Sequence, residues 1–143
     1  MDIELPLDID SVKGFLHPDE GAALYRAALA CAPLGPCLEI GSYCGKSTVY
    51  LGAAVKKAGG VLFAVDHHRG SEENQLGEEY HDPALYDGAA GLMDSFREFR
   101  ATVARVGSDV VVSIDYYNDV GVFVSSAFAT SLTLRGGGAP QST

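Results

Sequence analysis

Blocks of apolar residues alternate with polar or glycine-rich breaks along most of the chain, and they predict helices and strands in turn. A stretch rich in helix formers begins at Pro18, carries acids in its opening turn and stops before Pro33, which predicts a first helix. The apolar run 36–41 ends at a glycine and predicts a strand. Residues 46–58 then predict a second helix, which stops at Gly59.

A second strand and a third helix follow. Residues 61–65 form a continuous apolar run that ends at Asp66, as expected for a parallel strand covered on both faces. After a polar loop over 67–87, apolar residues recur at spacings of three and four and predict one face of a helix: Leu92, Phe96, Phe99, Val103 and Val106. Residues 110–112 predict a third strand.

This alternation predicts an α/β fold of the Rossmann-like kind, with a mostly parallel sheet and helices on both faces. Parallel strands joined by helices make right-handed crossovers, and ligands bind at the carboxyl ends of such strands. At 143 residues the chain is expected to form a single domain. We divide it into an N-terminal extension (1–16), a Rossmann-like half (17–114) and an atypical tail (115–143).

Composition and charge argue against several classes of partner. The formal net charge of −9 makes nucleic acid an unexpected partner, because phosphate backbones are bound by clustered Lys and Arg. No apolar stretch approaches the roughly 20 residues that cross a bilayer, and the first ten residues are acidic where a signal peptide is basic. We therefore expect a cytoplasmic protein without membrane contact. The cysteines, Cys31, Cys37 and Cys44, lack a C-x-x-C pair and are expected to be reduced packing residues.

The turn between the first strand and the second helix carries the most informative motif. Glycines at 41 and 45 let the backbone turn sharply and approach a ligand, and the next helix offers free amides at its first turn. As a phosphate loop, the motif has Ile40 where the first glycine belongs. As a dinucleotide fingerprint, it has Tyr43 and Lys46 where glycines belong.

The third interpretation of the turn is E-x-G-x-x-x-G, with an acid closing the second strand. Together these features resemble the class I S-adenosylmethionine-dependent methyltransferases, and residues 38–47 resemble the first motif of the catechol O-methyltransferase-like branch. The resemblance covers about residues 20–114 and implies S-adenosylmethionine as the cofactor. The cofactor-binding residues that we expect are Glu39, Gly41, Ser42, Tyr43, Gly45, Lys46, Ser47, Asp66 and His67.

The resemblance implies that these residues contact different parts of the cofactor. The turn from Gly41 to Gly45 would line the methionine and ribose side of the cofactor, and Glu39 would act near its amino group. Asp66 follows Gly41 by 25 residues, near the spacing of about 20 at which an acid accepts from both ribose hydroxyls. The alternative is an acid that caps a strand end in solvent.

The loop that begins at His67 is expected to overlie the ligand crevice. Its two adjacent histidines, with Glu72 and Glu73, raise the question of a metal site, but neighbouring side chains on an extended chain point to opposite faces. We therefore predict a solvated polar loop and assign no metal ligand. The related O-methyltransferases place their magnesium-binding acids after a fourth strand, and we find no such segment in this sequence.

Two interpretations of residues 115–143 remain open. Turn-forming residues over 115–121 separate two runs of strand formers, which predicts a hairpin. Alternatively, the tail is a frameshift product, because shifting the codons of residues 128–139 by one base permits an apolar run followed by Val-Glu-Gly-Gly-His, which resembles the family's fourth strand and the turn after it. On either interpretation we expect the fold to be incomplete relative to the full methyltransferase fold, and its exposed sheet edge favours aggregation or a homodimer.

The resemblance implies transfer of a methyl group from S-adenosylmethionine to a small-molecule acceptor, with oxygen as the expected acceptor atom. Such enzymes hold the methyl group and the nucleophile in line and use a base or a metal to ionise the acceptor. No residue of this sequence is assigned as that base. The alternatives are a cofactor-binding remnant without catalysis and, as a third choice, a phosphate-loop-like nucleotide hydrolase.

Overall fold

The computed structural model describes residues 3–107 and, as backbone, the strand 111–115. The main elements follow the predicted order: α1 (Pro18–Cys31), β1 (Cys37–Ile40), α2 (Lys46–Ala58), β2 (Leu62–Asp66), α3 (Phe96–Val106) and β5 (Val111–Asp115). The bounds predicted for α2 are confirmed at both ends. Its last turn carries Lys56 and Lys57 and closes on Gly59, which has the left-handed conformation typical of a helix stop.

The three longer strands form one parallel sheet in the order β1-β2-β5. Glu39 pairs with Ala64, and the Gly41 amide donates to the Val65 carbonyl at 2.9 Å. The carboxyl ends of β1 and β2 therefore lie side by side, as the Rossmann-like prediction required.

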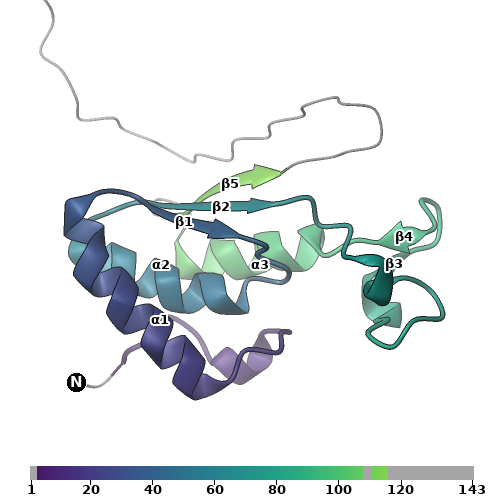
Figure 1. The fold of residues 1–143 in the computed structure, drawn as a ribbon, viewed down its shortest axis with the longest axis horizontal. Coiled ribbons are helices and arrows are strands. Elements are labelled where there is room, and N and C mark those ends of the chain that lie inside the picture. The colour runs from purple at the N-terminus through teal and green to yellow at the C-terminus, as the bar shows by residue number, and fades with distance from the viewer. Residues whose placement is uncertain (1–2, 108–110, 116–143) are drawn as a thin grey trace, which may run out of the picture.

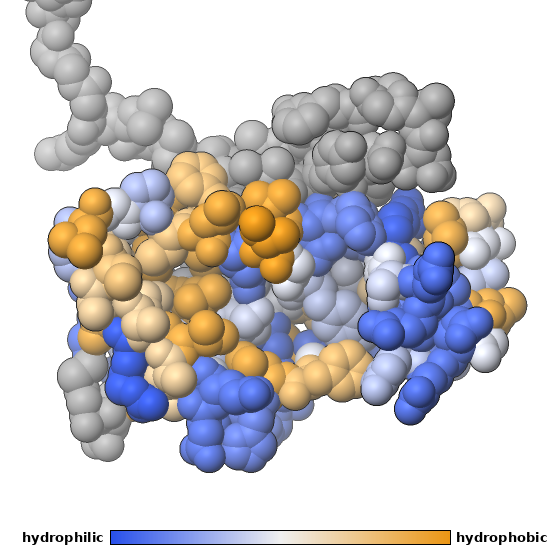
Figure 2. Space-filling model, in the orientation of Figure 1, coloured by the Kyte–Doolittle hydropathy of each residue, from blue (hydrophilic) through white to orange (hydrophobic). Residues whose placement is uncertain are grey.

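All three long helices lie on one face of this sheet (Figure 1). On the other face, Leu38 and Ile40 keep 62% and 79% of their surface exposed. Figure 2 shows hydrophobic residues gathered over the region of β1 and the neighbouring end of α1. We predicted helices on both faces of the sheet. Within the described residues, the long helices cover one face.

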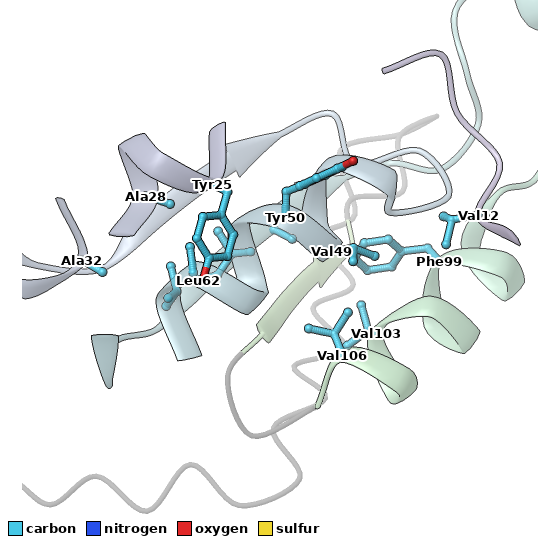
Figure 3. Packing of buried hydrophobic residues seen from close by; sticks show 13 residues of the cluster. Val12, Tyr25, Ala28, Ala32, Val49, Tyr50, Leu62, Phe99, Val103 and Val106 are labelled. Carbon is cyan, nitrogen blue, oxygen red and sulfur yellow. The ribbon is translucent and has the colours of Figure 1, made fainter. Parts of the chain in front are cut away.

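The core lies between the sheet and these helices (Figure 3). Tyr25 of α1, Leu62 of β2 and Phe99 of α3 are each at most 1% exposed. Val12 joins the same cluster at 5% exposed, although it precedes the first helix. The segment that we treated as an extension therefore contributes to the core of the domain.

The region between β2 and α3 differs from the prediction. Leu92 belongs to a short hairpin, β3 (Tyr86–Asp87) and β4 (Leu92–Met93), and not to the third helix. The helix begins at Phe96 because the Asp94 carboxylate accepts from the Phe96 amide at 2.9 Å and so satisfies a free donor of the first turn. The loop also contains the 3-10 turns Glu72–Asn74 and Pro83–Leu85.

A membrane-spanning helix would need a length and an apolar character that no helix in the described part of the chain has.

Candidate functional site

The turn from β1 to α2 contains three residues with positive φ: Gly41 at 84°, Tyr43 at 50° and Gly45 at 92°. The sharp turn expected from its glycines is confirmed, but the two glycines differ in their surroundings. A Cβ on Gly41 would meet no atom within 4 Å. A Cβ on Gly45 would lie 3.0 Å from Thr102 Cγ2 and 3.3 Å from the Phe99 ring. Gly41 thus leaves open space, whereas Gly45 lets α3 approach the turn.

Glu39 is 7% exposed, and its carboxylate holds the first turn of α2. The Thr48 hydroxyl donates to Oε2 at 2.6 Å, and the Ser47 hydroxyl donates to Oε1. Burial raises the pKa of Glu39, and these hydroxyl hydrogen bonds partly oppose that rise. The carboxylate therefore lies behind the turn, where its first partners are side chains of the protein.

Asp66 joins the two loops that leave β1 and β2. Its Oδ2 accepts from the Tyr43 amide and its Oδ1 accepts from the His68 amide, both at 2.7 Å. Charge-assisted bonds of this kind are stronger than neutral ones, so Asp66 holds Tyr43 in its unusual conformation. Sequence reasoning considered a ribose ligand or a solvent-exposed cap, and it missed this role.

Ser42 is 2% exposed, and its hydroxyl oxygen makes no regular hydrogen bond within the described residues. The hydroxyl does lie near enough to Glu39 to favour the charged form of that carboxyl group. A buried polar atom without a good partner costs about 1 to 3 kcal/mol.

A cavity of about 340 Å³ lies in front of the turn. Its walls come from the segment before α1, from the start of α1 and from the turn and first residues of α2: Gly14, Phe15, Leu16, Glu20, Gly41, Ser42, Tyr43, Lys46 and Ser47. Its volume falls in the range of about 300 to 1,000 Å³ that is usual for small-molecule sites. The cavity lies at the carboxyl end of β1, where a ligand was expected.

The predicted cofactor-binding residues fall into four groups. Five line the cavity: Gly41, Ser42, Tyr43, Lys46 and Ser47. Glu39 and Asp66 support the turn from behind, and Gly45 packs against α3. His67 is exposed, and its Nδ1 accepts from the Arg69 amide at 3.0 Å.

Sequence reasoning missed the wall that comes from the N-terminal segment, namely Gly14, Phe15, Leu16 and Glu20. A weak signal was present, because Gly14 and Phe15 stand just before the proline that opens α1. That position places Gly14 and Phe15 beside the surface that the first turn of α1 faces. Which surface it faces depends on how α1 packs on α2, and the pattern does not encode that arrangement.

The two histidines of the loop after β2 lie in different environments, but on a bend and not on the extended, solvated chain that the prediction assumed, since His68 has a φ of 58°. His67 is exposed, whereas His68 is 1% exposed, with Nδ1 3.0 Å from the Ser95 hydroxyl and its ring 4.9 Å from that of Phe99. Among the residues that the structure describes, no three metal-ligating side chains are grouped to hold an ion.

These features define a Rossmann-like α/β domain with a ligand cavity at the glycine turn. A family model described as a methyltransferase domain matches residues 38–133, well over half of the chain. The chain therefore belongs to this family, which confirms the predicted membership of the class I methyltransferases. The proposed branch stays a prediction. Residues 116–143 lie outside the described part, so both interpretations of the tail also stay predictions.

Proposed function

We propose that the cavity binds S-adenosylmethionine and that the chain transfers a methyl group to a small-molecule acceptor, at oxygen, as in the catechol O-methyltransferase-like branch. The observation that carries this proposal is the open space beside Gly41, next to the buried Ser42 hydroxyl. A turn without side-chain bulk suits a ligand that lies directly against the backbone.

The charges of the cavity suit the amino-acid end of this cofactor. Lys46 stands at the start of α2, where its ammonium group and the positive end of the helix both favour a carboxylate. Glu20 also lines the cavity and can accept from an amino group, although one of its oxygens also accepts from the His17 amide at 3.0 Å. Asp66 retains lone pairs for ribose hydroxyls, because a carboxylate offers about four acceptor sites.

When bound, S-adenosylmethionine supplies a methyl group activated by a positively charged sulfur. The contribution of the chain is to bind and orient, since holding the reacting groups in line lowers the barrier. Tyr43 does not serve as the base, because burial raises its pKa to about 12 and keeps the phenol protonated at neutral pH. The same holds for the Cys44 thiol, whose pKa burial also raises to about 12. We assign no catalytic base.

Thermal unfolding with S-adenosylhomocysteine and with ATP separates the three functions under consideration. A ligand that binds only the folded state raises Tm by mass action. Stabilisation by S-adenosylhomocysteine alone supports the proposal, and stabilisation by ATP alone supports the nucleotide hydrolase. Binding of the cofactor without methyl transfer to any acceptor in a broad panel identifies a non-catalytic remnant.

Asp66→Ala tests the site itself. Loss of its two backbone hydrogen bonds and of its contact with ribose should weaken S-adenosylhomocysteine binding by about 1 to 3 kcal/mol in calorimetry. Asp19→Ala is the matched control, because that side chain is 94% exposed and lies away from the cavity. Equal affinities in the two variants would contradict the assignment of Asp66.

A further inference from the structure

Three aromatic rings from distant parts of the chain meet at the cavity. The Phe15 ring stacks on Tyr43, with centroids 6.0 Å apart and an angle of 29° between planes. Its edge contact with Tyr80 has centroids 5.9 Å apart. Phe15 nevertheless remains 76% exposed and Tyr80 46% exposed. Grouped apolar side chains that stay exposed beside a cavity are typical of a binding surface.

The three residues before Phe15 anchor it to the rest of the domain. Val12, three residues before it, is buried in the core. The Lys13 ammonium pairs with the Asp82 carboxylate at 2.5 Å, which ties the segment to the loop that carries Tyr80. Gly14 lies so close to α2 that a Cβ there would be 2.9 Å from the Cβ of Lys46. The exposure of Phe15 therefore belongs to an anchored segment and not to a loose terminus.

The charged side chains of the cavity match only part of the proposed cofactor. Lys46 suits its carboxylate and Glu20 suits its ammonium group, but the cofactor carries a third charge on its sulfonium sulfur. Among the residues that line the cavity, Glu20 is the one carboxylate, since Glu39 bonds to Ser47 and Thr48. The Asp66 carboxylate accepts from two backbone amides and is assigned to the ribose. Besides backbone carbonyl and hydroxyl oxygens, the cavity offers the faces of the Phe15 and Tyr43 rings, which have negative character and attract cations.

We propose that Phe15, stacked on Tyr43, recognises the sulfonium charge of the cofactor through a cation–π contact. This inference rests on the proposed function and adds a specificity residue from the N-terminal segment. Its consequence is discrimination between the charged cofactor and S-adenosylhomocysteine, whose sulfur is neutral. The aromatic pair thus favours binding of the cofactor and release of the product.

The test measures the Kd of the 143-residue chain for S-adenosylmethionine and for S-adenosylhomocysteine by calorimetry. Phe15→Leu keeps an apolar side chain but removes the ring. It should weaken binding of the charged cofactor by about threefold to tenfold, as expected for loss of a partly exposed cation–π contact, and should change product binding little. Phe15→Trp should restore the ratio of the two affinities. Leu34→Ala, at a residue 88% exposed and outside the cavity, is the control.

The outcomes separate this inference from the function on which it rests. If the unchanged chain binds neither ligand, both the proposed function and the inference fail. If it binds both ligands and Phe15→Leu lowers the two affinities equally, the function stands and the sulfonium contact is wrong. A Phe15→Trp variant that binds like Phe15→Leu would also overturn the inference, because indole is the stronger cation–π partner.

Discussion

The two halves of the turn between β1 and α2 are continuous in sequence, but one half faces the cavity and the other packs against the core. Gly41, Ser42 and Tyr43 face the cavity, and this half includes an open position and a hydroxyl without a regular partner. Cys44 and Gly45, in contrast, pack against the interior of the domain. Cys44 is 1% exposed, and its carbonyl accepts from the Thr102 hydroxyl at 2.8 Å.

This difference shows how a rigid site can include unsatisfied groups. The core-facing half fixes the turn through α3, and Asp66 fixes the Tyr43 amide from the neighbouring strand. The cavity-facing half can then leave space and polar atoms for a ligand without losing its conformation. Matched substitutions in the two halves should therefore separate stability from binding.

The largest effect is expected for Gly45→Ala, which should lower the free energy of unfolding by about 2 to 4 kcal/mol. Part of this loss comes from a non-glycine residue at φ 92°, and part from overpacking against Thr102 and Phe99. Denaturant unfolding measures the change. A loss of only about 1 to 2 kcal/mol, which the left-handed conformation alone accounts for, would mean that α3 yields at this contact. A loss below about 1 kcal/mol would contradict the prediction.

Gly41→Ala should affect binding more than stability. Its φ of 84° costs about 1 to 2 kcal/mol, but no protein atom lies within 4 Å of the added methyl group. The methyl group enters the cavity, so the affinity for S-adenosylhomocysteine should fall by about tenfold or more, as overpacking costs of 1 to 3 kcal/mol imply. Calorimetry on both alanine variants completes the comparison, and cofactor affinity equal to that of the unchanged chain would contradict the proposed position of the ligand.

The smallest effect concerns pH. Burial raises the folded-state pKa of Glu39 above its ordinary 4.5, so the folded state holds a proton more tightly than the unfolded state. The resulting stabilisation is present below pH 4.5 and is lost as the pH rises through the raised pKa. Glu39→Gln should therefore gain stability relative to the unchanged chain over that interval, as measured by urea unfolding at several pH values. Glu4→Gln, at an exposed position, is the control, and parallel profiles for Glu39→Gln and the unchanged chain would refute the expected shift.

Local patterns were sufficient to predict the main elements. The helix formers of residues 46–58 stand between glycines, and the apolar run before Asp66 has the composition of a buried parallel strand, so both were predicted within a residue. The positions of Gly41 and Asp66 followed from the same local order. The error at Leu92 arose because an apolar residue at helical spacing also fits a two-residue strand, and the hairpin was decided by Gly91 and Asp94.

The features of the site that the sequence does not predict depend on contacts between distant parts of the chain. Phe15 meets Tyr43 and Tyr80 across 28 and 65 residues of chain, and no periodic pattern encodes such a meeting. Asp66 was recognised as a site residue, but its bonds to two backbone amides depend on loop conformations that only the folded chain defines. The sequence therefore predicts the part of the cavity formed by the glycine turn, but not the part formed by the segment before α1.

The ion pair between Lys13 and Asp82 joins residues 69 positions apart and ties the segment before α1 to the loop that carries Tyr80. Its partners are 42% and 27% exposed, so dissolved ions screen their attraction, whereas the buried bonds of Glu39 are shielded from such screening. Ionic strength therefore weakens the Lys13–Asp82 ion pair more than it weakens the hydrogen bonds of Glu39. Rising salt should loosen the segment that carries Phe15 while the glycine turn stays intact. The rate of ligand exchange would then be sensitive to salt.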